Sequence, residues 1–174
     1  NSDFVSLIDR AFRNFMDKDV ETLIIDVRNN PGGTNSFSDP LIAWFANKPF
    51  RFASTFIMKS SLYAEQSNAK RLAQAQSNPS EVSMRLAKAF KQNPFGTTFE
   101  FDVSDSEPRS GDQFGGDVYV LVDRTTYSNA VSLAAIVQDY DFGEVIGEST
   151  ADFATTYASM ESFTLNESGI VVGF

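Results

Sequence analysis

Two short segments of the sequence carry residue types that could cleave an acyl bond. Residues 29–33 read Asn-Asn-Pro-Gly-Gly, and residues 127–130 read Tyr-Ser-Asn-Ala. Consecutive glycines leave backbone N–H groups unobstructed by a Cβ atom, and such groups can hold an oxyanion. A serine at the start of a helix can project its hydroxyl from a sharp turn, where the helix N-terminus favours developing negative charge. The two segments together predict a nucleophile, Ser128, beside an oxyanion site.

Each segment also has a purely structural interpretation. Residues 29–33 could be a plain tight turn before the next helix. Serine is a preferred N-cap, so Ser128 could do no more than cap the helix that follows it. The sequence of either segment alone favours the structural interpretation, and only their combination favours chemistry.

The elements expected to position the two segments are strands of a sheet. Residues 22–27 and 118–122 are continuous apolar runs with β-branched residues, which predict strands buried on both faces. Apolar periodicity predicts helices over 3–17 and 128–139, and residues 144–147 read as a further short strand. Strand and helix alternate, so we expect an α/β fold. Ligands of such sheets bind at the carboxyl ends of the strands, where both segments lie.

The other predicted elements surround this core. Asp39 with Pro40 predicts a helix start, and residues 51–59 and 99–103 predict strands. Polar helices are expected over 61–76 and from 81 onward, the second opened by a capping box at 78–81. Residues 161–165 and 169–174 read as a hairpin. We therefore expect one domain over residues 1–174 with a helical insertion at about 60–95. The chain starts without Met and ends inside an apolar run, so we expect it to belong to a longer polypeptide.

Composition excludes several classes of function. The net charge of −9 disfavours binding to nucleic acid or to an anionic membrane surface. The absence of Cys and His removes thiolate catalysis and the commonest metal ligands, and no cofactor or metal is expected. No apolar run is long enough to predict a membrane span. An acidic loop does not match a calcium-binding loop and is expected to be solvated; it contains Asp102, Asp105, Glu107 and Asp112.

The two chemical segments and their flanks resemble the C-terminal-processing (tail-specific) serine peptidase family, which includes tricorn-core-like members. Residues 23–33 read Leu-Ile-Ile-Asp-Val-Arg-Asn-Asn-Pro-Gly-Gly and resemble the family's "LIIDLRNNPGG" segment. Residues 120–130, with Gln-Asp at 138–139 and Ile-Gly-Glu-Ser-Thr at 146–150, are similar to its nucleophile segment. The resemblance is good over about 20–33 and 117–150, and elsewhere it holds in outline.

This resemblance implies a ClpP/crotonase-like ββα core with a helical insertion, and hydrolysis of peptide bonds through an acyl-enzyme on Ser128. By the same alignment, Asn129 and either Gly32 or Gly33 supply the oxyanion hole. The implied substrate is a peptide or protein bound as an added strand, the implied location is periplasmic or extracellular, and an oligomer is possible. Fold kinship alone would also suggest an acyl-CoA enzyme of crotonase type, which is an analogy rather than a site argument.

The general base is where the sequence departs from the family pattern. The Lys that many members carry aligns with Phe153, its partner Gln aligns with Tyr157, and the sequence has no His. Three explanations follow: a base outside these residues, which we favour; Lys59 reaching Ser128 from elsewhere; or an inert module that binds peptides or other ligands on the same fold.

Two further carboxylates are expected near the predicted site. Glu148 and Asp152 could orient a base or a substrate, although ordinary loop polarity explains both equally well.

Overall fold

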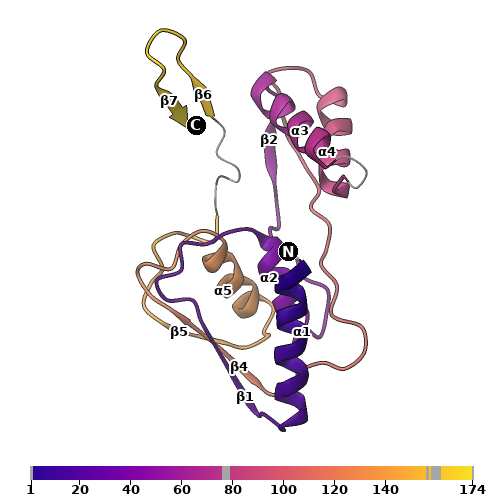
Figure 1. The fold of residues 1–174 in the computed structure, drawn as a ribbon, viewed down its shortest axis with the longest axis vertical. Coiled ribbons are helices and arrows are strands. Elements are labelled where there is room, and N and C mark those ends of the chain that lie inside the picture. Colours follow the sequence, from indigo (N-terminus) through magenta and orange to yellow (C-terminus); the bar gives the residue numbers. More distant parts are fainter. Residues whose placement is uncertain (1, 76–78, 156, 158–161, 174) are drawn as a thin grey trace. The chain divides into compact units, whose positions relative to one another are not determined.

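The computed structural model describes residues 2–75, 79–155, 157 and 162–173. The chain divides into two compact units (Figure 1). Unit 1 consists of Asn1–Phe52 and Ser104–Thr156, and unit 2 consists of Ala53–Val103 and Tyr157–Phe174. Both chemical segments of the sequence belong to unit 1.

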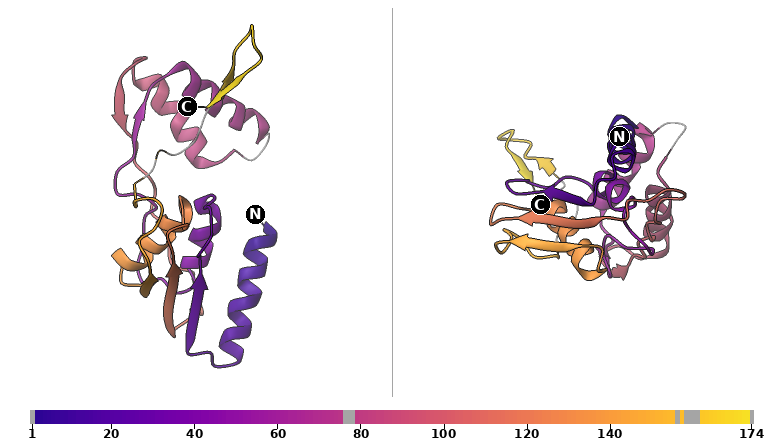
Figure 2. Two further views of the ribbon diagram at one scale, coloured as in Figure 1. Left: turned by 90° about the vertical axis from the view of Figure 1, so that its left-hand side faces the viewer. Right: turned by 90° about the horizontal axis from the view of Figure 1, so that it is seen from below.

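A three-stranded parallel sheet lies at the centre of unit 1. Its strands are β1 (Thr22–Asp26), β4 (Asp117–Val122) and β5 (Glu144–Gly147), side by side in the order β1-β4-β5 (Figure 2). The register aligns Asp26 of β1 with Leu121 of β4. Because all three strands run in the same direction, their carboxyl ends lie at one edge of the sheet. The expected α/β class is confirmed.

The helices of unit 1 are α1 (Ser2–Asp17), α2 (Asn35–Ile42) and α5 (Asn129–Asp139). Their buried side chains pack with one face of the sheet, and the core includes Phe12, Trp44 and Val137 together with Val118, Val120 and Val122 of β4. The apolar patterns over 3–17 and 128–139 therefore predicted both α1 and α5 correctly.

The prediction that the core strands are buried on both faces is wrong for β1. Its residues alternate between partly buried and exposed, and Ile24 is 60% exposed. The core cluster contains Val118 and Val120 of β4 but not Tyr119, which lies opposite Ile24 in the register. Among the described residues, the core therefore lies on one face of this sheet, and a continuous apolar run did not reveal this.

The start of α2 also differs from the prediction. Thr34, not Asp39, is the N-cap, and its side chain accepts a hydrogen bond from the backbone N–H of Ser36. Asp39 and Pro40 lie inside the helix, which ends at Ile42. A threonine directly after two glycines provides the cap one turn earlier than the Asp-Pro pair suggested.

Unit 2 contains two helices and two small antiparallel ladders. The helices are α3 (Leu62–Gln74) and α4 (Glu81–Gln92). One ladder pairs β2 (Ile57–Lys59) with β3 (Thr98–Glu100), and the other pairs β6 (Ser162–Thr164) with β7 (Val171–Gly173). The predicted helices and hairpin are confirmed within the described residues, whereas the strand predicted over 51–59 is shortened to its last three residues.

The capping box predicted at 78–81 is wrong. Ser80 is the N-cap of α4, and its side chain accepts from the backbone N–H of Ser83, so Glu81 is the first helical residue. Asn78 lies outside the described residues. The predicted insertion at about 60–95 overlaps unit 2, and a single domain over residues 1–174 stays a prediction.

Candidate active site

The two chemical segments meet at the carboxyl edge of the sheet in unit 1. Residues 29–33 follow β1, and residues 127–130 follow its neighbour β4. The backbone N–H of Tyr127 donates to the carbonyl of Asn30 at 3.0 Å, which joins the two loops directly. The sheet topology therefore brings together residues that are almost a hundred positions apart in the sequence.

Ser128 occupies the N-cap position of α5 in a strained conformation. Its backbone has φ 54° and ψ −125°, and its side chain makes no capping hydrogen bond. Its carbonyl accepts from the backbone N–H groups of Val131 and Ser132, which anchors the turn to the helix. Such a conformation costs a non-glycine residue about 1–3 kcal/mol and is concentrated at functional sites. The capping interpretation of Ser128 therefore does not hold, because the hydroxyl is not used as a cap.

Gly32 packs directly against this serine. A Cβ atom at Gly32 would lie 2.7 Å from the Cβ of Ser128 and 2.8 Å from the backbone nitrogen of Asn129. Its φ of 94° is also unfavourable for any other residue. The neighbouring Gly33 has open space where its Cβ would lie. Only the first glycine is therefore required for the close approach of the two loops.

The N–H groups of this site are not equally available. Gly32 donates its N–H to the side-chain oxygen of Asn30 at 2.9 Å. In the part of the chain that the structure describes, the N–H groups of Gly33 and Asn129 have no hydrogen-bond partner. The two free donors belong to the residues that directly follow Gly32 and Ser128 in the sequence, and unbonded N–H groups are the kind that can hold an oxyanion.

The side chain of Asn129 links α5 to the start of α2. Its Nδ2 donates to the carbonyl of Thr34 at 3.2 Å, and its Oδ1 lies 3.4 Å from the hydroxyl of the buried Ser38. Next to Ser38, burial raises the pKa of Asp39, although hydrogen bonds from Ser106 and Asn35 oppose this shift. The helix after the glycine loop is thus tied to the residue after the predicted nucleophile.

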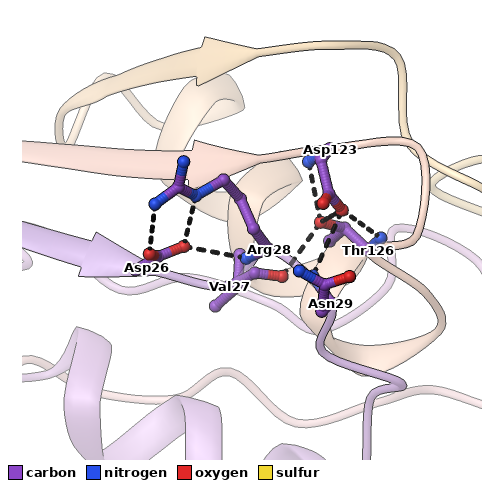
Figure 3. A network of polar contacts seen from close by, with 6 residues as sticks. All are labelled: Asp26, Val27, Arg28, Asn29, Asp123 and Thr126. Atoms are coloured by element: carbon purple, nitrogen blue, oxygen red, sulfur yellow. Dashed lines mark hydrogen bonds and ion pairs between the residues drawn. The ribbon is translucent and has the colours of Figure 1, made fainter.

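A network of hydrogen bonds connects the residues that follow β1 with those that follow β4 (Figure 3). The carboxylate of Asp123 accepts hydrogen bonds from the backbone N–H groups of Asn29, Thr125 and Thr126. These bonds and the one from the Thr125 hydroxyl, which has the largest effect, lower the pKa of Asp123 to about 2. Sequence analysis missed Asp123 and Thr126 as residues of the site, although Asp-Arg-Thr-Thr at a strand end is a recognisable turn signal.

A second carboxylate lies beside this network. Asp26 forms a two-fold ion pair with Arg28, at 2.9 and 2.7 Å, and also accepts from the backbone N–H of Arg28. The hydrogen bonds from Arg28 lower the pKa of Asp26 to about 2. This pair is exposed and lies at the end of β1.

Two of the supporting residues predicted from the sequence, Glu148 and Asp152, form no hydrogen bond or ion pair with Ser128 in the described part of the chain. Glu148 lies 3.7 Å from Arg124 in an exposed ion pair, and the Asp152 carboxylate accepts from the backbone N–H of Phe153. Phe153, at the position where the resemblance implies Lys, is 84% exposed. Lys59 ends β2 in unit 2, whereas Ser128 lies in unit 1.

The hydroxyl of Ser128 has no hydrogen-bond partner among the described residues. The same residues contain no group of three or more acidic side chains that could hold a metal ion. In the acidic loop, Asp105 pairs with Arg51 and Asp102 pairs with Arg85. No helix in the described ranges is long and apolar enough to cross a membrane.

Comparison with known proteins places this geometry in context. The sequence model of peptidase family S41 matches residues 2–171. No curated protein matches the chain. The chain is similar to the structure of a photosystem II D1 C-terminal processing protease, with a TM-score of 0.58 and 19% identity, covering 99% of this chain and 33% of that one.

It is also similar to the structure of mature CPAF, with a TM-score of 0.60 and 18% identity over 99% of this chain and 36% of the other. A Ser-to-Ala variant of CPAF gives a TM-score of 0.64 at 16% identity, covering 99% of this chain and 37% of that one. The chain therefore spans about a third of the length of these structures. At these identities, the similarity concerns the fold alone.

Proposed function

Because the chain belongs to peptidase family S41, we propose that it carries the nucleophile and the oxyanion site of a serine endopeptidase of the C-terminal-processing type. The observation that carries this proposal is the conformation of Ser128, which is strained, makes no cap and packs against Gly32. A structural N-cap would need none of these features.

In the proposed reaction, the Ser128 hydroxyl oxygen attacks the carbonyl carbon of the scissile peptide bond and gives its proton to a general base. The carbonyl oxygen becomes an oxyanion, which the N–H groups of Asn129 and Gly33 receive. The tetrahedral intermediate collapses, and the amine leaves with a proton from the base. Water then hydrolyses the acyl-enzyme by the same steps and regenerates the serine.

The assignment of Gly33 rather than Gly32 as the second donor rests on availability. The N–H of Gly32 is already bonded to Asn30, whereas that of Gly33 is free among the described residues. Gly32 has a different proposed role, since its missing side chain makes room for Ser128.

The general base is proposed to come from outside residues 1–174. The described residues offer the Ser128 hydroxyl no partner, the sequence has no His, and the structures that resemble this chain are about three times as long. A base supplied by a further segment or another subunit would account for all three observations.

The substrate is proposed to be an extended peptide or protein segment, bound along an edge of the sheet near the site. The name of the D1 processing protease supports cleavage near a C-terminus. A periplasmic or extracellular location is a further proposal that follows from the family resemblance.

The competing function is an inert binding module on the same fold. It is favoured by the exposed Phe153, which stands where the resemblance implies a Lys base. An inert module would have no use for a strained serine that is left uncapped, and for this reason the peptidase is the better account.

Labelling with a fluorophosphonate probe, read by mass spectrometry, separates the two functions. We expect the protein that contains this chain to be labelled at Ser128, and Ser128→Ala to abolish labelling. Ser132→Ala, which removes a serine from the helix that Ser128 precedes, should leave labelling unchanged. Absence of labelling in folded wild-type protein would favour the binding module. Labelling of the 174 residues alone would place a base within them.

A further inference from the structure

Asp123 lies where the two loops of the site are joined (Figure 3). Its Oδ1 oxygen accepts from the backbone N–H of Asn29, in the loop after β1, at 3.2 Å. The same oxygen accepts from the backbone N–H groups of Thr125 and Thr126, in its own loop, at 2.9 and 3.0 Å. One carboxylate oxygen thus binds both loops.

The hydroxyl of Thr125 adds a further link in the same place. It lies 2.7 Å from Asp123 Oδ1 and 3.0 Å from the side-chain oxygen of Asn29. Asn29 has a φ of 57°, so the glycine loop turns sharply at the residue that donates to Asp123. Hydrogen bonds from backbone amides to a carboxylate are stronger than those to a neutral oxygen, which suits an acid at this position.

Thr126 continues the connection into the interior. It is fully buried, and its hydroxyl donates to the carbonyl of Val27 at 2.9 Å and accepts from the backbone N–H of Asp123 at 3.0 Å. Tyr127, which follows Thr126, donates its N–H to the carbonyl of Asn30, and Ser128 follows Tyr127. The network therefore ends one residue before the strained serine and two residues before Gly32.

We infer that Asp123 is a positioning residue of this active site: its carboxylate fixes the spacing between the glycine loop and the nucleophile turn. The inference rests on the proposed function for its catalytic consequence. The physical reason is that Ser128 and the oxyanion donors come from different strands, and a shift of about 1 Å between reacting groups can cost about 100-fold in rate. The bonds of Asp123 oppose such a shift, together with the bonds from Thr126 to Val27 and from Tyr127 to Asn30.

The test compares Asp123→Ala with Asp123→Asn, which keeps one acceptor oxygen at nearly the same place. Asp17→Ala removes an exposed carboxylate at the end of α1 and is the matched control. The first readout is amide hydrogen exchange of Tyr127, whose bond to Asn30 crosses the loops without involving Asp123. The amide of Val120, in the middle of β4, reports global unfolding.

We expect Asp123→Ala to accelerate exchange at Tyr127 by about tenfold or more relative to Val120. Asp123→Asn should restore most of the protection, and the control should change nothing. Equal acceleration at Tyr127 and Val120 would overturn the inference, since Asp123 would then contribute only to global stability.

The second readout is the rate of fluorophosphonate labelling at Ser128. It should fall by about 100-fold in Asp123→Ala and recover largely in Asp123→Asn. Unchanged labelling in Asp123→Ala would also overturn the inference. If wild-type protein is not labelled, the proposed function fails, while the exchange experiment still decides whether Asp123 holds the loops together.

Discussion

Gly32 and Ser128 are packed so closely that a methyl group on the glycine would lie 2.7 Å from the Cβ of the serine. The contact joins the loop after β1 to the loop after β4. It explains in physical terms why the two sequence segments belong to one site.

The first prediction concerns this contact. Gly32→Ala should destabilise the fold by about 2–4 kcal/mol, because overpacking and an unfavourable positive φ both add to the cost. It should also abolish labelling of Ser128. Chemical denaturation and probe labelling are the measurements. Gly115→Ala is the control, since nothing lies within 4 Å of its added Cβ. Normal labelling of Gly32→Ala would contradict the close contact.

The second prediction concerns the strain at Ser128. Ser128→Gly and Ser128→Ala both lack the nucleophile, but only glycine adopts φ 54° and ψ −125° without steric cost. We therefore expect the Gly variant to be more stable than the Ala variant by about 1 kcal/mol. At Ser132, inside α5, the order should be reversed, because glycine destabilises a helix interior by about 1 kcal/mol relative to alanine. If the Ala variant were more stable than the Gly variant at both positions, Ser128 would not be strained.

The sequence predicted those features of this protein that depend on local pattern. The periodicity of Phe12 and its neighbours predicted α1, and the two motifs predicted two loops that the structure brings together. It failed where the tertiary environment decides. Ile24 looks like a core residue in sequence, yet the helices of unit 1 pack on the other face of the sheet. Asp39 looks like a cap, but Thr34 provides the cap one turn earlier.

Asp123 was missed for a related reason. An aspartate after a strand is common in turns, and its sequence neighbours show only that it can bond to its own loop. The bond to Asn29 becomes visible only when β1 and β4 are paired in the correct register. Residues that join two distant segments are therefore the ones that sequence reasoning on a single chain finds last.

The third prediction concerns the acid titration of Asp123. Its pKa is lowered to about 2 in the folded protein, against an unfolded value near 3.9, so it favours folding above pH 4 and this contribution is lost as the pH falls toward 2. Carboxyl NMR should give a midpoint of about 2. Thr125→Val should raise that midpoint, because the Thr125 hydroxyl makes the largest contribution to the shift.

Thr155→Val, at an exposed position, is the control for this titration. It should leave the Asp123 midpoint where it is in the wild type. An Asp123 midpoint near 3.8 in the wild type would show that the hydrogen-bond network does not form in solution.

The fourth prediction concerns Asp39, whose pKa is shifted in the opposite direction to that of Asp123. Burial raises its pKa, so the folded protein holds the proton more tightly than the unfolded chain does. This carboxyl therefore favours folding most when protonated, and its contribution declines as the pH rises through the unfolded and then the folded pKa. Asp39→Asn keeps an oxygen that can accept from Ser106 and removes the ionisation. Its free energy of unfolding, relative to wild type, should therefore increase between pH 4 and pH 7, whereas Thr155→Val, which removes no ionisable group, should show no such increase. A pH-independent difference would mean that Asp39 is solvated as an ordinary surface carboxylate.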